Sequence, residues 1–217
     1  MRRFSFCLVL GLTVPSVSAA QENRLEGRLS DATRLEIDAV LDSVRTAGLP
    51  VEPLIDRALE GAAKRAPEDL IVRAVRRLWG ELDTAKQAFG EAASTAELTA
   101  GAAAIRAGAT QEDLAQLRAL RPEQSVTMAA AVLADLVAVG VPADTAIVAV
   151  LALAPAVSDS DYLAFRRNVE QDISLGASPS AALDVWLQAE ALNSPVDGFS
   201  ANDPGTTGST PPTKRKP

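Results

Sequence analysis

The chain has 217 residues, and its 28 acidic and 21 basic side chains give a formal net charge of −7. Because phosphate binding needs a concentrated basic surface, this balance argues against nucleic acid as a partner. The chain has no histidine and a single cysteine, Cys7. The usual catalytic triads, thiol nucleophiles and zinc sites are therefore excluded from all but its N-terminal segment.

Residues 1–20 match the pattern of a secretory signal peptide. Arg2 and Arg3 precede an apolar stretch over residues 6–14, and Pro15 and a run of small residues lead to an expected cleavage after Ala19 or Ala20. The apolar stretch is shorter than the roughly 20 residues of a membrane-spanning helix, so we do not expect it to act as an anchor.

Cleavage would leave residues 21–217, a chain with no cysteine and with a net charge of −9, because Cys7, Arg2 and Arg3 are removed. A protein without disulfides is stabilised by its core alone. Exported proteins of this kind are more typical of bacteria than of eukaryotic secretory pathways. We therefore expect a bacterial protein in the periplasm or outside the cell.

Residues 21–193 are predicted to form one all-α domain, since apolar residues recur at helical spacing and no alternating β-branched run occurs. The clearest apolar stripes lie over residues 37–44, 51–62, 70–82 and 162–173. Glycines that suit helix ends and prolines that suit first turns separate these stripes; they are Gly48, Gly108, Gly140 and Gly176, and Pro50, Pro67, Pro122, Pro142 and Pro179. Ser94 with Glu97, and Thr110 with Asp113, have the spacing of capping boxes.

The segment from Gly48 to Lys64, GLPVEPLIDRALEGAAK, resembles a segment of uncharacterised exported helical proteins of bacteria. The resemblance covers about a tenth of the chain. It implies export and carries no function.

Two all-α arrangements fit the spacing of these glycines and prolines. The four glycines are 60, 32 and 36 residues apart, and the longest gap holds an extra helix predicted over residues 95–107. Stacked helical hairpins repeat at intervals close to the two shorter spacings. A compact helical bundle, however, can have glycines and prolines at similar intervals. The apolar run over residues 145–157 is too short to span a membrane, and we predict that it forms a central core helix.

No residue is assigned to a catalytic, cofactor-binding or metal-binding site. The carboxylate pair Asp38 and Asp42 is expected on a solvated face. Asp159 and Asp161 follow Ser158 at a helix start, where they cap the helix, and the stretch lacks the distal glutamate of a calcium loop. Ser178 is likewise interpreted as a cap, because it precedes a proline.

A basic cluster over residues 57–77 contains Arg57, Lys64, Arg65, Arg73, Arg76 and Arg77. Residues 45–90 hold 8 basic and 7 acidic side chains, so the local charge is only +1. We therefore interpret the cluster as a solvated face with charge pairs rather than as an anion site.

Residues 194–217 are rich in proline, glycine, serine and threonine, which predicts a disordered tail. For the whole protein, we expect a non-enzymatic interaction or scaffold module that binds another envelope protein. The alternatives are a carrier of an apolar small molecule or lipid and, less favoured, a carboxylate-dependent cell-wall hydrolase with a buried acid of raised pKa. The oligomeric state is left open.

Overall fold

Nine α-helices and no strand make up the part of the chain that the computed structural model describes, residues 24–193. The helices are α2 (Asp31–Thr46), α3 (Glu52–Ala63), α4 (Glu68–Phe89), α5 (Thr95–Ala107), α6 (Gln111–Leu120), α7 (Thr127–Ala138), α8 (Ala143–Leu153), α9 (Asp159–Ser174) and α10 (Pro179–Asn193). The all-α prediction is confirmed. The expected signal peptide (1–20) and tail (194–217) lie outside the described residues.

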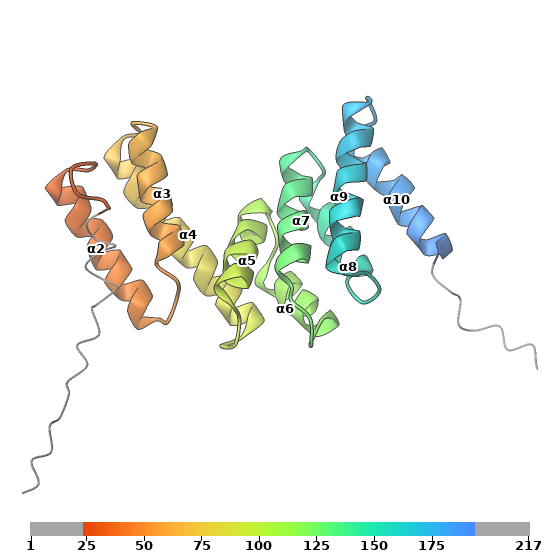
Figure 1. Cartoon of the computed structure of the whole chain (residues 1–217), viewed down its shortest axis with the longest axis horizontal. Coiled ribbons are helices and arrows are strands. Elements are labelled where there is room, and N and C mark those ends of the chain that lie inside the picture. Colours follow the sequence, from red (N-terminus) through yellow and green to blue (C-terminus); the bar gives the residue numbers. More distant parts are fainter. Residues whose placement is uncertain (1–23, 194–217) are drawn as a thin grey trace, which may run out of the picture.

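The helices stack side by side in an extended row, with α2 and α10 at its opposite ends (Figure 1). Each helix makes its main contacts with helices that are one or two places away along the chain. The helices α4, α6, α8 and α10 contact one another in succession, and α5, α7 and α9 form a second succession. Such neighbour-only packing is typical of stacked helical hairpins, which is the first of the two arrangements that the sequence leaves open.

The predicted capping boxes and helix-ending glycines agree with the observed helix ends, and the predicted first-turn prolines agree less closely. Both predicted capping boxes form, at the starts of α5 and α6. Gly48, Gly108, Gly140 and Gly176 all have positive φ angles at or just after helix ends. Of the prolines expected in first turns, only Pro179 lies inside a helix, as the first residue of α10. Pro67 and Pro142 are the N-caps of α4 and α8, and Pro50 precedes the N-cap of α3. Pro122 lies in the connection after α6, five residues before α7 begins at Thr127.

The predicted stripes supply much of the core. Ile37, Val40, Leu41 and Val44 of α2 are all buried. The prediction that residues 145–157 form a central helix is wrong in part, because Val148 of α8 is 65% exposed. In a stacked row each helix has neighbours on some sides only, so even an almost wholly apolar helix keeps a solvent-facing edge.

A buried arginine joins two connections of the stack. Arg121, at the C-terminal end of α6, is only 2% exposed. Its guanidinium donates to the main-chain oxygen of Val157 at 2.8 Å and to the carboxylate of Asp159 at 2.8 Å, and it lies over the ring of Tyr162. The charge is paired and hydrogen-bonded, as burial requires. The contact therefore fixes the α6–α7 connection against the α8–α9 connection.

Within residues 24–193, no helix is both long enough and apolar enough to cross a membrane.

Candidate functional site

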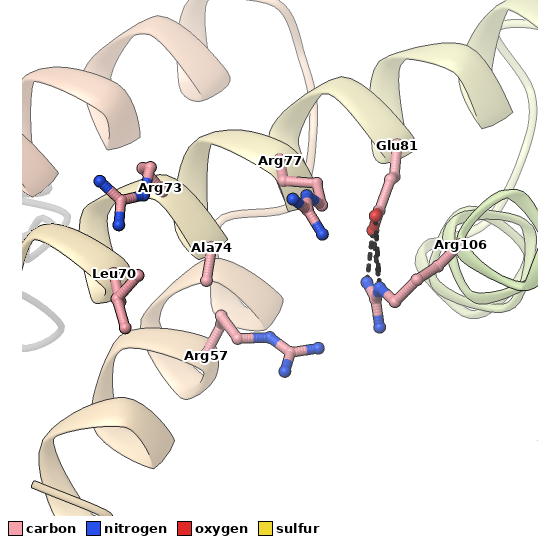
Figure 2. Close-up of a pocket in the computed structure, with 7 residues that line it drawn as sticks. All are labelled: Arg57, Leu70, Arg73, Ala74, Arg77, Glu81 and Arg106. Atoms are coloured by element: carbon pink, nitrogen blue, oxygen red, sulfur yellow. Dashed lines mark hydrogen bonds and ion pairs between the residues drawn. The ribbon is translucent and has the colours of Figure 1, made fainter. Parts of the chain in front are cut away.

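The candidate site is a surface pocket of about 300 Å³ where α3, α4 and α5 meet. Four arginines, one glutamate and two apolar side chains line it (Figure 2); they are Arg57 of α3, Leu70, Arg73, Ala74, Arg77 and Glu81 of α4, and Arg106 of α5. The volume is at the lower end of ligand pockets, so the site suits a small group rather than an extended ligand.

Helix α4 supplies five of the lining residues because they form one stripe along it. Each of Leu70, Arg73, Ala74, Arg77 and Glu81 is three or four residues from another member of the set, which places them on one side of a helix. This stripe borders the buried face of α4, which includes Ile71, Val75, Leu78 and Leu82. Leu70, expected in the core, is 46% exposed and forms part of the pocket wall.

Glu81 and Arg106 close one side of the pocket. The Nε of Arg106 donates to a carboxylate oxygen of Glu81 at 3.0 Å, and a second nitrogen of the same guanidinium pairs with that carboxylate. Glu81 is only 7% exposed, whereas Arg106 lies in the last turn of α5 and keeps part of its side chain in solvent. A two-point pair of this kind orients the guanidinium.

The other arginines differ in their pairing. Arg57 pairs with Glu60 at 3.2 Å, and Arg73 pairs with Asp69 at 2.8 Å. Within the described part of the chain, Arg77 has no ion pair or side-chain hydrogen bond. Of the predicted basic cluster, Arg57, Lys64, Arg73 and Arg76 have ion pairs, as expected, whereas Arg65 and Arg77 have none among residues 24–193.

Three guanidinium groups face the same space. In Figure 2, Arg57, Arg77 and Arg106 surround the gap between α3, α4 and α5, whereas the guanidinium of Arg73 lies on the far side of Leu70 and Ala74. Sequence analysis placed Arg57 and Arg77 in one basic cluster but gave no sign of Arg106, which is 29 residues further along the chain. Converging guanidinium groups are suited to hold a carboxylate or another anion.

The two buried acids of the described region, Glu81 and Glu97, are both paired with arginines. Burial alone would raise the pKa of Glu97, but its bonds to the N–H groups of Ser94 and Val126 and to Arg118 lower the pKa to about 2. Glu97 is thus held as a carboxylate, whereas a catalytic acid needs a raised pKa.

The acidic residues that the sequence singled out have structural partners. Asp42 pairs with Arg45 at 2.7 Å, and Asp159 pairs with the buried Arg121. Asp161 and Ser158 form the capping box of α9. Ser178 accepts a hydrogen bond from the N–H of Ala181 at 3.3 Å, as the cap interpretation predicts. Among residues 24–193, no group of acidic side chains is placed to hold a metal ion.

A second groove, whose lining residues are mostly apolar, lies near the C-terminal end of the row. Its volume is about 290 Å³, and residues of α8, α9 and α10 contribute to it; the lining residues are Leu153, Val157, Asp161, Ala164, Phe165, Asn168 and Trp186. Trp186 is partly buried and donates from its indole nitrogen to Asp172 at 3.2 Å.

Comparison of the chain with protein-family models, with curated proteins and with solved structures finds no match.

Proposed function

We propose that this chain is a non-enzymatic interaction module of the bacterial envelope, which binds an anionic group of another envelope protein in the arginine pocket. The observation that carries the proposal is the guanidinium of Arg77, which pairs with no group among residues 24–193 and faces a pocket beside those of Arg57 and Arg106. Arginine is enriched at protein interfaces because its planar donors recognise carboxylates with defined geometry.

The surroundings of the pocket support recognition rather than catalysis. Glu81, the one acid in the lining, is engaged by Arg106 through two nitrogens. The chain after residue 20 has an expected net charge of −9, so a cationic pocket is a local exception on an acidic molecule. A stack of helices also keeps a large surface for its volume, which suits a module that binds other proteins.

Cross-linking and capture from the cell envelope tests the proposal. The tagged chain over residues 21–217 would be compared with Arg77→Glu and with the matched control Arg76→Glu, which changes the neighbouring arginine of α4 by the same charge. Arg76 pairs with Glu36 and does not line the arginine pocket. We expect one near-stoichiometric partner with the unchanged chain and the control, and loss of that partner with Arg77→Glu.

The possible results test two claims separately: that the chain is an interaction module, and that the arginine pocket is its binding site. Absence of any reproducible partner would contradict the interaction module. Equal capture by both charge-reversed variants would retain the module but exclude the arginine pocket as its binding site. A form that ends at residue 193 would show whether residues 194–217 contribute.

The alternative function, transport of an apolar small molecule or lipid, is favoured by the groove beside Phe165 and Trp186. Mass spectrometry of the protein purified from its own cells tests this alternative. A co-purifying apolar molecule that is lost on Phe165→Ser but kept on Arg77→Glu would favour the carrier over the interaction module.

A further inference from the structure

We infer that the arginine pocket binds a single carboxylate of an acidic peptide segment that also carries a neighbouring apolar side chain. This inference rests on the proposed function and specifies the chemistry of the partner. It follows from the charge of the pocket, from the shape of the groups that line it, and from the apolar wall beside them.

The charge balance of the pocket fits one negative charge. Each of the lining arginines except Arg77 already has a carboxylate: Arg57 has Glu60, Arg73 has Asp69 and Arg106 has Glu81. One guanidinium is therefore left for a ligand. A dianionic phosphate would bring a second negative charge close to Glu60 and Glu81, which no cation of the lining would balance.

The donors of the pocket fit a planar group. A guanidinium can present parallel N–H donors to the two oxygens of a carboxylate. Arg77 has its donors available for the same two-point contact, and Arg57 faces it across the gap (Figure 2). A ligand carboxylate between Arg57 and Arg77 would accept hydrogen bonds from both guanidinium groups.

The apolar wall of the pocket favours a ligand that has an apolar side chain next to its carboxylate. Leu70 and Ala74 lie on the same stripe of α4 as Arg77, two turns and one turn before it respectively. Leu70 is 46% exposed, so it offers apolar surface that a ligand can cover. A leucine-sized side chain adjacent to the bound carboxylate would remove that surface from water.

Titration of the isotope-labelled chain over residues 21–217 with blocked peptides, followed by backbone amide shifts, tests the inference. The probes are acetyl-Gly-Leu-Glu-Gly-amide, the neutral analogue with Gln in place of Glu, and the analogue with Ser in place of Leu. Inorganic phosphate and vesicles that contain an anionic phospholipid complete the set. We expect the Glu peptide to bind about tenfold more tightly than the Gln peptide, as for one charge-assisted contact.

Matched variants locate the contact. Arg77→Gln should weaken binding of the Glu peptide about tenfold, Arg77→Lys should weaken it less because the charge stays, and Arg76→Gln should leave it unchanged. Leu70→Ser should reduce binding of the Leu-containing peptide to that of the Ser-containing one. Amide shifts caused by the Glu peptide should fall on α3, α4 and the end of α5.

Four results would overturn the inference. They are equal affinity for the Glu and Gln peptides, equal effects of Arg77→Gln and Arg76→Gln, tighter binding of phosphate than of the Glu peptide, and binding of anionic vesicles that depends on Arg77 when the peptide does not bind. Capture of an envelope protein that requires Arg77, together with no binding of the Glu peptide, would refute the peptide chemistry and leave the proposed function standing.

Discussion

The same substitution, glycine to alanine, should have opposite effects at two positions of the stack. Gly80, in the middle of α4, is exposed, and a Cβ atom added there meets nothing within 4 Å. Gly101, in α5, is buried, and its Cβ would lie 2.6 Å from the ring of Phe89 and 2.8 Å from the Cβ of Ala85. The two sites thus differ in packing while sharing the helical backbone.

Helix propensity and packing together set the expected change in the free energy of unfolding at each site. Alanine is favoured over glycine inside a helix by about 1 kcal/mol, and this gain applies at both sites. At Gly101 it is opposed by overpacking, which costs about 1–3 kcal/mol. The cost lies in the upper part of that range because Ala85 has no torsion that could move its Cβ away. We expect Gly80→Ala to raise the free energy of unfolding by about 1 kcal/mol and Gly101→Ala to lower it by about 1–2 kcal/mol.

Urea unfolding followed by far-UV circular dichroism measures both effects, with thermal unfolding as a second measurement. For a domain of this size, 1 kcal/mol corresponds to about 2–4 °C in Tm. Ala85→Gly should cost less in the Gly101→Ala background than alone, because it removes one of the two close contacts. If Gly101→Ala stabilised the protein as much as Gly80→Ala, the close packing of α4 against α5 would be refuted.

Three further predictions concern single side chains. The pKa of Glu97 is lowered from 4.5 to about 2, which corresponds to a contribution of about 3 kcal/mol to the free energy of unfolding. This contribution should be complete above pH 4.5 and should be lost as the pH falls toward 2. In acid-unfolding curves, Glu97→Gln should remove this pH dependence. Arg121→Met should lower the free energy of unfolding by about 1–3 kcal/mol, because the main-chain oxygens of Ala154 and Val157 lose their donor; little change in urea unfolding would contradict the joining role of Arg121. Val148→Lys should change stability by less than about 0.5 kcal/mol, as for a surface position; a large loss would restore the central-helix prediction for α8.

The features that sequence analysis predicted correctly depend on residues close together in the chain. The capping box of Ser94 and Glu97 joins residues three apart, and each helix-ending glycine acts on its own turn. The extra helix predicted over residues 95–107 is observed as α5 with those bounds. Its many small residues indicated close helix packing, and the contact of Gly101 with α4 confirms it.

The features that were missed depend on contacts between helices. Glu97 was identified as a capping residue, but its carboxylate also accepts from the N–H of Val126 and pairs with Arg118. Apart from Ser125, the hydrogen-bond partners of the Arg121 guanidinium are 33 to 38 residues away in the chain. No local pattern distinguishes Arg121 from the solvent-exposed arginines, because its burial is a property of the stacked connections.

The arginine pocket shows why a search for short motifs finds no site in a chain of this kind. Neighbouring helices of the stack are joined by short connections, so side chains that meet between them are separated by one helix and one connection. Arg57, Arg77 and Arg106 accordingly lie 20 and 29 residues apart. The sequence does contain one usable signal, the stripe from Leu70 to Glu81 that borders the buried face of α4 with charged side chains. In stacked helical proteins, such flanking stripes are the positions where side chains of successive helices can converge, and in this chain the stripe supplies Arg77, on which the proposed recognition depends.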